Sequence, residues 1–255
     1  ASCCLKVPAP PGILPLSLRA PLPSCRQDPV RLLISDDVGI GKTIEAGLIA
    51  VELLAQGDAR RLAVLCSPAL AEQWQRELRE KFGIDAELVL TSTVRRLERG
   101  LMMNESLFDR HPYVVVSTDF IKSANRRHEF LNHSPDMVIV DEAHTAVSDD
   151  GAGGRRQRHQ RHDLLRDLAK DQSRHLILVT ATPHSGKDEG FRNLIALHDP
   201  ELGTTNLDDV QGQKKRAEHS VQRPRADYRT HPDEGTASPP TRPYASPPDT
   251  PSTLI

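Results

Sequence analysis

The stretch Ser35-Asp-Asp-Val-Gly-Ile-Gly-Lys-Thr43 is the most informative segment of the chain. An apolar run, residues 32–34, precedes it, and an amphipathic segment, residues 44–56, follows it. Glycines in a turn between a strand and a helix let backbone N–H groups point inward, and the helix adds its N-terminal partial positive charge. The pattern therefore predicts a phosphate-binding loop. Taken alone, it also fits a glycine turn that caps a helix beside a surface lysine.

The side chains of this loop have separate expected roles. Lys42 would pair with the β- and γ-phosphates of ATP, and the Thr43 hydroxyl would ligate Mg²⁺. Asp36 stands where phosphate loops usually begin with glycine. The residues expected to bind the nucleotide are Asp37, Gly39, Ile40, Gly41, Lys42 and Thr43.

Short apolar runs alternate with amphipathic segments through the middle of the chain. This alternation predicts an α/β domain with a mostly parallel sheet that helices flank on both faces. The expected strands are residues 31–35, 62–66, 86–90, 113–117, 137–140 and 176–179. The expected helices are residues 44–56, 70–82, 119–132, 162–170 and 190–198.

Proline marks the expected boundaries of this domain. Of the 20 prolines, seven lie in residues 1–29 and seven in residues 232–251. Dense proline opposes helices and sheets because it fixes φ and removes an amide donor. We therefore expect an irregular lead at residues 1–28, a folded domain at 29–203 and a low-complexity, disordered tail at 204–255.

Composition narrows the class of protein. The formal net charge of −2 gives no bulk argument for nucleic-acid binding, so DNA contacts would need local patches. No apolar run reaches the roughly 18 residues that span a bilayer. The four cysteines form no C-x-x-C pair, which argues against a zinc site or a disulfide framework. A cytoplasmic protein is the expectation.

The segment Val138-Ile-Val-Asp-Glu-Ala-His144 places two carboxylates at the end of an expected strand. Ligands bind at this edge of open parallel sheets. Asp141 would hold Mg²⁺, Glu142 would orient or deprotonate the attacking water, and His144 would relay the nucleotide state to neighbouring motifs. The alternative is an Asp-Glu pair that caps a helix.

The order Gly-Lys-Thr, Asp-Glu-Ala-His, Thr180-Ala-Thr-Pro183 resembles helicase superfamily two. Residues 36–47 resemble the D-E-x-G-x-G-K-T-I-E-A-G loop of its Swi/Snf-type ATPases, with Asp37 where glutamate is usual. Residues 66–78, with Gln73-Trp-Gln-Arg-Glu-Leu78, are similar to the family's motif Ia. Residues 181–187 and 191–200 resemble bacterial members, among them the helicase component of the DISARM phage-defence system.

The resemblance implies the first of two RecA-like lobes of an ATP-driven motor on double-stranded DNA, with other defence-system proteins as possible partners. Coupling of ATP to DNA would use His144, Thr180, Ala181 and Thr182, and a DNA strand would meet Ser67, Ser117 and Thr118. Ordinary strand-end hydroxyls are the equal alternative for the last three. We expect no second lobe in residues 204–255, and hence very weak independent ATP hydrolysis. The alternative is a non-catalytic remnant that folds and binds nucleotide or a partner.

Two further features are open to more than one interpretation. Trp74, the single tryptophan, has helical spacing with Leu70 and Leu78, which favours a position in the core or on the surface of the lobe over stacking on bases. The basic run at residues 155–162 favours a solvated loop that enters a helix at His162 over a DNA-contacting loop. Its histidines have no acidic or thiolate partners, so no metal site is expected there. Nothing in the sequence indicates an oligomeric state.

Overall fold

The computed structural model describes residues 28–36, 41–146, 155–181, 194, 196–197 and 220–221. Within these residues the chain forms one seven-stranded sheet, in which every neighbouring pair of strands is parallel. The sheet confirms the predicted α/β class. In spatial order the strands are β3 (Glu87–Val89), β4 (Tyr113–Ser117), β2 (Leu62–Cys66), β5 (Met137–Val140), β6 (His175–Ala181), β1 (Arg31–Asp36) and β7 (Ser220–Val221).

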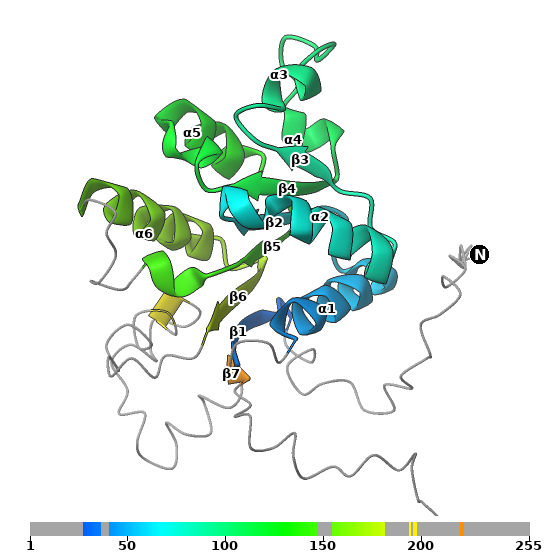
Figure 1. Cartoon of the computed structure of the whole chain (residues 1–255), viewed down its shortest axis with the longest axis vertical. Coiled ribbons are helices and arrows are strands. Elements are labelled where there is room, and N and C mark those ends of the chain that lie inside the picture. Colours follow the sequence, from blue (N-terminus) through cyan, green and yellow to red (C-terminus); the bar gives the residue numbers. More distant parts are fainter. Residues whose placement is uncertain are drawn as a thin grey trace, which may run out of the picture. The chain divides into compact units, whose positions relative to one another are not determined.

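Two layers of helices cover the sheet (Figure 1). On one face lie α1 (Lys42–Gln56) and α2 (Pro68–Phe82). The other face carries α3 (Val94–Leu97), α4 (Leu107–Arg110), the 3-10 turn η2 (Phe120–Lys122), α5 (Ala124–Asn132) and α6 (Arg155–Lys170). A second 3-10 turn, η3 (Ala143–Ala146), follows β5.

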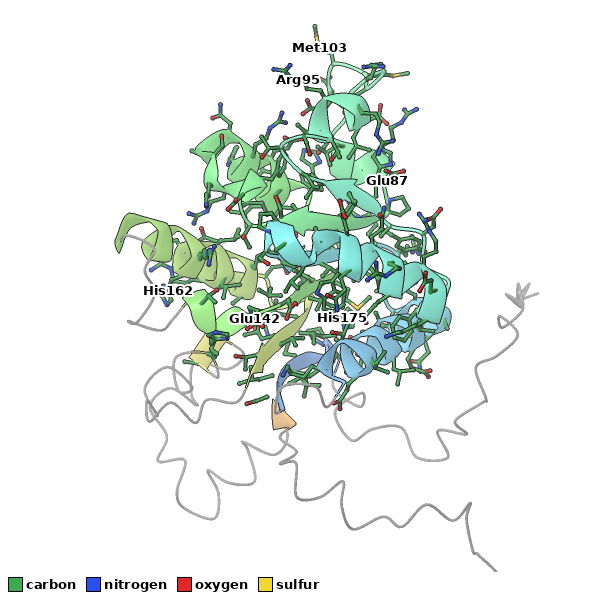
Figure 2. All side chains as sticks on the ribbon, viewed as in Figure 1. Glu87, Arg95, Met103, Glu142, His162 and His175 are labelled. Atoms are coloured by element: carbon green, nitrogen blue, oxygen red, sulfur yellow. The ribbon has the colours of Figure 1, made fainter. Side chains whose placement is uncertain are left out.

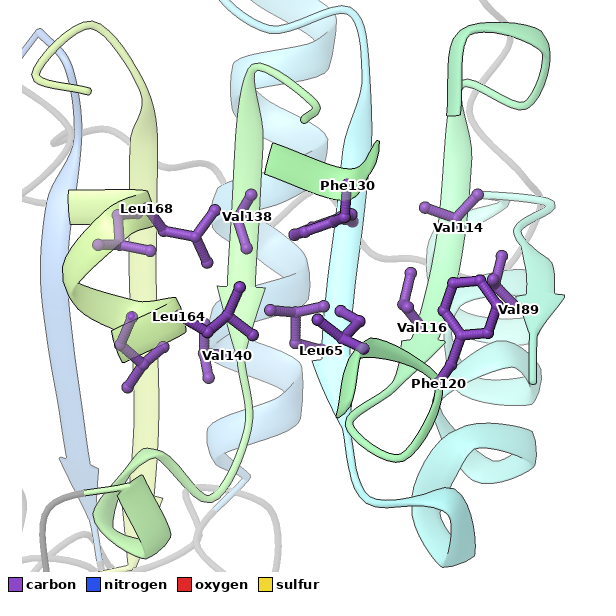
Figure 3. Close-up of a cluster of buried hydrophobic side chains, with 14 of the residues drawn as sticks. Leu65, Val89, Val114, Val116, Phe120, Phe130, Val138, Val140, Leu164 and Leu168 are labelled. Carbon is purple, nitrogen blue, oxygen red and sulfur yellow. The ribbon is translucent and has the colours of Figure 1, made fainter. Parts of the chain in front are cut away.

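The central strands are apolar without interruption because both of their faces are covered. All five residues of β2 and all four of β5 are buried. Figure 3 shows the cluster on the α5 and α6 face, where Leu65, Val138 and Val140 of the sheet meet Phe130 and Leu164 of the helices. Such burial on both sides is the usual environment of parallel sheets.

Gly47 lets α1 and α2 pack closely on the other face. A Cβ atom on this residue would lie 2.2 Å from Cε2 of Phe82, which is far inside van der Waals contact. Proline at the first turn of α2 and a left-handed Gly83 at its end fix the limits of that helix. The close packing holds the start of α1, and therefore Lys42, at a set position beside α2.

Buried basic groups close the amino edge of the sheet. Arg31 donates to the backbone oxygens of Ala169, Asp171 and Leu197 at 3.0–3.1 Å. Arg174 donates to those of Pro135 and Leu168 at 3.2 and 3.3 Å. Most of these oxygens lie at the end of α6, where helix carbonyls lack partners within the helix. The two arginines thus supply hydrogen bonds to five backbone carbonyls at this edge, of which those of Ala169 and Asp171 also accept from Gln172 Nε2 and from the Arg174 N–H.

The structure differs from the sequence expectation in four elements. The helix expected at residues 119–132 is divided at Ser123 into η2 and α5. Helix α6 begins at Arg155, so the basic run is helical and is no entry loop. The short helices α3 and α4 carry too few residues to show a periodic pattern. Strand β7 lies within the segment expected as a tail and has only two residues. Most of the helix expected at residues 190–198 lies outside the described part.

Candidate functional site at the carboxyl edge of the sheet

A cavity of about 380 Å³ opens where α1 begins and β5 ends. Its walls include Lys42 and Thr43 from the start of α1 and Trp74 from α2. Asp141 and Glu142 come from the turn after β5 and also line it. Residues separated by almost 100 positions in the sequence therefore surround one space at the carboxyl edge, where parallel α/β sheets bind their ligands.

The start of α1 is built for close approach of a ligand. Gly41 is the residue before the helix and has φ of 94°, a left-handed conformation that glycine adopts without strain. Its carbonyl accepts hydrogen bonds from the N–H groups of Ile44 and Glu45 at 2.8 and 3.0 Å. The helix consequently begins at Lys42, and its N-terminal partial positive charge lies beside the cavity.

Asp141 is held by two donors and by the sheet. Its backbone N–H donates to the Leu65 carbonyl at 2.8 Å, which extends the pairing of β5 with β2. The N–H of Glu142 donates to Oδ1 and the indole Nε1–H of Trp74 donates to Oδ2, both at 2.8 Å. Burial raises the pKa of Asp141, whereas these hydrogen bonds and the charge of Lys42 act in the opposite direction.

Glu142 and His144 form a second polar group at the same edge. Oε2 of Glu142 lies 3.1 Å from Nδ1 of His144, which lies 3.0 Å from Oγ1 of Thr180. The hydrogen bond with His144 lowers the pKa of Glu142, and the charges of His144 and Lys42 lower it further against the effect of burial. Glu142, whose side chain is labelled in Figure 2, is therefore an anionic acceptor at neutral pH. Its φ of 51° is unusual for a residue with a side chain and marks a sharp turn after β5.

The structure gathers only part of the predicted site. It brings Gly41, Lys42, Thr43, Asp141 and Glu142 to the cavity and joins His144 to Thr180. Ala181 is the last residue of β6 and is paired with Asp36 of β1. The predicted nucleotide-binding residues Asp37, Gly39 and Ile40 and the coupling residue Thr182 lie outside the described residues.

The three candidate DNA-contacting hydroxyls lie at the carboxyl ends of β2 and β4, which are neighbours in the sheet. Ser117 is buried, and its Oγ accepts the N–H of Phe120 at 3.2 Å, so it supports a turn. Ser67 precedes α2, and its hydroxyl forms no capping bond. The Oγ1 atom of Thr118 is buried without a hydrogen-bond partner. These contacts favour the strand-end role for Ser117 and leave Ser67 and Thr118 as candidates for DNA.

Trp74 is the site residue that sequence reasoning missed. Its spacing indicated a core position, and its side chain is indeed 2% exposed. A buried indole N–H nevertheless needs an acceptor, and here the acceptor is the carboxylate of Asp141. That requirement was the one signal in the sequence, but it does not say which acceptor is used.

The cavity residues fit a magnesium ion that accompanies a nucleotide. Thr43 and Asp141 offer a hydroxyl and a carboxylate oxygen, the ligand type that Mg²⁺ prefers. Such sites use one or two protein oxygens and complete the shell with water and phosphate. In the described residues no group of three or more His, Cys, Asp or Glu side chains could hold a metal by itself.

Cys66 lies buried at the end of β2 near this site. Burial, with a smaller contribution from Asp141, raises the pKa of its thiol to about 12. The thiol is therefore protonated at neutral pH and is a poor nucleophile.

In the described part of the chain, no helix is long and apolar enough to cross a membrane.

The chain is similar in sequence to much longer bacterial proteins. The chain is 31% identical over 188 residues to the uncharacterized ATP-dependent helicase YqhH of Bacillus subtilis, which covers 73% of this chain and 29% of that protein. It is 31% identical over 171 residues to the RNA polymerase-associated protein RapA of Proteus mirabilis, covering 67% and 17% respectively. The chain thus spans less than a third of the length of these relatives.

Solved structures share the fold. The SWI2/SNF2 ATPase core of Sulfolobus solfataricus in complex with dsDNA matches with a TM-score of 0.54 at 14% identity, over 78% of this chain and 41% of that one. The helicase domain of Pyrococcus furiosus Hef matches with a TM-score of 0.52 at 18% identity, over 78% of this chain and 35% of that one.

The family model for the DEAD/DEAH box helicases matches residues 22–189, which include the whole cavity. The chain therefore belongs to the DEAD/DEAH box helicase family.

Proposed function

We propose that the chain is the ATP-binding RecA-like lobe of a Swi/Snf-type ATPase that couples ATP hydrolysis to movement on, or remodelling of, double-stranded DNA. The observation that carries the proposal is the shared cavity of Lys42, Thr43, Asp141 and Glu142. A phosphate-binding lysine, two oxygen ligands for a cation and an anionic base are the parts that nucleoside triphosphate hydrolysis requires.

Each of these residues has one role in the proposed reaction. The ammonium group of Lys42 binds the β- and γ-phosphates, and the N-terminus of α1 adds N–H donors. Thr43 and Asp141 hold Mg²⁺, which neutralises charge on the phosphates when it is bound. Glu142 orients the attacking water and accepts its proton, and its lowered pKa keeps the carboxylate ionised so that it can accept a hydrogen bond from that water at neutral pH. His144 and Thr180 connect that carboxylate to β6.

Full hydrolysis needs a group that this cavity does not supply. No arginine lines it in the described residues. An arginine that stabilises charge on the γ-phosphate is worth roughly 10³–10⁵ in rate in related enzymes. The proposal therefore expects nucleotide binding with very weak turnover by this chain alone. Steady-state turnover on DNA at roughly 1–100 s⁻¹, the range of efficient phosphoryl-transfer enzymes, would contradict it.

Nucleotide binding is tested by titration with a fluorescent ATP analogue and Mg²⁺. We expect the wild-type chain to bind and Lys42→Ala to lose at least about 100-fold in affinity, near 2.7 kcal/mol. Lys170→Ala is the matched control, because Lys170 is exposed and pairs with Asp167 near the end of α6, away from the cavity. Equal affinity of Lys42→Ala and Lys170→Ala would reject the phosphate loop.

Duplex binding is supported by two observations. Ser67 and Thr118 lie side by side at the carboxyl edge, and a chain of the same fold was solved with dsDNA bound. We expect Ser67→Glu to weaken binding of a labelled duplex at low salt, because a new negative charge at the proposed DNA path would repel the phosphates. Gln172→Glu places the same charge at the amino edge and is the control. Equal duplex affinity of the two variants would argue against this DNA path.

A narrower proposal concerns the biological process. The likeness of residues 181–187 and 191–200 to the DISARM helicase component favours a role in phage defence with other defence proteins as partners. The expected result is that disruption of the gene raises phage plating efficiency, and that Glu142→Gln fails to restore resistance. Unchanged plating after disruption would reject this role.

A further inference from the structure

The indole of Trp74 connects α2 to the acidic end of β5. Its Nε1–H donates to Oδ2 of Asp141 at 2.8 Å. The ring is 2% exposed and packs in the apolar cluster between α2 and the sheet, together with Ala71 and Leu78. The indole is thus held by the core, and its one polar atom points to a carboxylate that lines the cavity.

The carboxylate of Asp141 accepts one hydrogen bond on each of its two oxygens. Oδ1 accepts the N–H of Glu142 while Oδ2 accepts the indole N–H, and the backbone N–H is fixed by Leu65. An ionised carboxylate has about four lone-pair sites, so two donors leave the remaining ones for other ligands. These two hydrogen bonds therefore determine which lone pairs of Asp141 remain available to a metal ion.

We propose that Trp74 is a positioning residue for the metal site, and that its N–H orients Asp141 to receive Mg²⁺ together with the nucleotide. The inference rests on the proposed binding of Mg²⁺ and ATP. Partners that orient metal ligands in this way typically change metal affinity 10- to 100-fold when they are removed. A tryptophan that only fills the core would affect stability, and it would affect binding with and without Mg²⁺ equally.

The test removes one hydrogen-bond donor and keeps the ring. Because Trp74 is the single tryptophan, a tryptophan auxotroph supplied with β-(3-benzothienyl)alanine replaces this side chain alone, with sulfur in place of the N–H. The full chain is then titrated with a fluorescent ATP analogue in Mg²⁺ and in EDTA. Trp74→Phe is a second variant that also lacks the donor.

We expect the ratio of affinities in Mg²⁺ and in EDTA to fall about 10-fold in the analogue-containing protein, with the affinity in EDTA within about twofold of wild type. Gln75→Met is the matched control on the same helix, because it removes the bond from Nε2 of Gln75 to the Ala86 carbonyl at 2.8 Å without touching the site. This control is expected to keep the wild-type ratio.

Two results would overturn the inference separately from the proposed function. The ratio could stay at the wild-type value in the analogue-containing protein, or both affinities could fall together with thermal stability, which is the signature of a packing role. If the wild-type chain itself binds the nucleotide equally in Mg²⁺ and in EDTA, the proposed Mg²⁺ site fails and the role of Trp74 fails with it.

Discussion

The two edges of the sheet carry similar charged residues and use them in opposite ways. At the amino edge, Arg31 and Arg174 are nearly buried, and they donate to backbone carbonyls around the end of α6. At the carboxyl edge, Lys42, Asp141 and Glu142 surround a cavity. The same sheet thus holds one set of charges that completes the fold and another set that faces space for a ligand.

This difference suggests a division between stability and function. Charges that satisfy buried carbonyls stabilise the chain, because an unpaired buried polar group costs about 1–3 kcal/mol. For the charged carboxylate of Asp141 beside the cavity, the cost of desolvation exceeds the stabilisation from its hydrogen bonds and from Lys42, as its raised pKa indicates. Substitutions at the amino edge should therefore change stability alone, and those at the carboxyl edge should change binding alone.

The largest expected loss of stability comes from Arg31→Met. This change removes three charge-assisted hydrogen bonds: the Leu197 carbonyl loses its donor, and the carbonyls of Ala169 and Asp171 keep only those from Gln172 and the Arg174 N–H. The free energy of unfolding should therefore fall by about 2–4 kcal/mol. Chemical denaturation measures it. Arg166→Met removes an exposed pair with Asp163 and should change stability by less than about 0.5 kcal/mol. A similar small loss for both variants would mean that the buried Arg31 stabilises the fold no more than an exposed arginine does.

Gly47→Ala tests the packing of α1 against α2. The new methyl group would meet the ring of Phe82, and overpacking of this kind costs about 1–3 kcal/mol. Without that contact, alanine would be favoured in a helix by about 1 kcal/mol. The double variant Gly47→Ala/Phe82→Ala should therefore show a positive coupling in a denaturation cycle. Additive effects of the two changes would mean that the contact is not formed.

Asp141→Asn tests the carboxyl edge in the same way. Asparagine keeps one oxygen for the Trp74 donor and removes a charge that burial disfavours, but its NH₂ group cannot accept the N–H of Glu142. Because these effects oppose each other, the stability of the variant should stay within about 1 kcal/mol of wild type. Its Mg²⁺-dependent nucleotide affinity should fall by more than about 10-fold, near 1.4 kcal/mol. Thermal unfolding and titration measure the two quantities. A loss of stability above about 1 kcal/mol would assign Asp141 to the fold.

The smallest expected effect concerns acid stability at the amino edge. The hydrogen bond from the Ser173 hydroxyl, with help from Arg174 and Arg31, lowers the pKa of Asp171 in the folded chain. This stabilisation is present above the unfolded pKa, near 3.8, and is lost as pH falls through the lower folded value. Because Asp171 is partly exposed, Asp171→Asn should reduce the stability difference between pH 6 and pH 3 by only a few tenths of a kcal/mol. If the stability difference between pH 6 and pH 3 is unchanged in the variant, Asp171 does not contribute to acid stability.

Much of the fold could be predicted because its strands are continuous apolar runs. The segments 62–66 and 137–140 were predicted with the same limits that β2 and β5 have in the structure. The basic run was misjudged because six of its eight residues are arginine or histidine, whereas helix α6 is stabilised by burial of Leu164, Leu165 and Leu168 after it. Strand β7 gave no signal, since two residues cannot form a pattern.

The candidate site divides in the same way. Lys42, Thr43, Asp141 and Glu142 could be selected because their spacing after glycine and after an apolar strand is tied to chemistry. The contact of Trp74 with Asp141 joins residues 67 positions apart, and the position of α2 on the sheet creates it. The hydrogen bond that the Ser117 hydroxyl accepts from the N–H of Phe120 likewise depends on the turn between these residues. Tertiary geometry of this kind cannot be read from local sequence.

Thermal unfolding with and without nucleotide tests whether the carboxyl edge binds ATP while the amino edge only stabilises the fold. Wild type, Lys42→Ala and Arg31→Met would each be melted with and without Mg²⁺ and ATP at about 100 times the wild-type dissociation constant. We expect wild type and Arg31→Met, from different starting stabilities, both to gain about 2.7 kcal/mol, whereas Lys42→Ala starts near wild type and gains almost nothing. A gain in Lys42→Ala equal to that of wild type would contradict the assignment of the carboxyl edge as the nucleotide site.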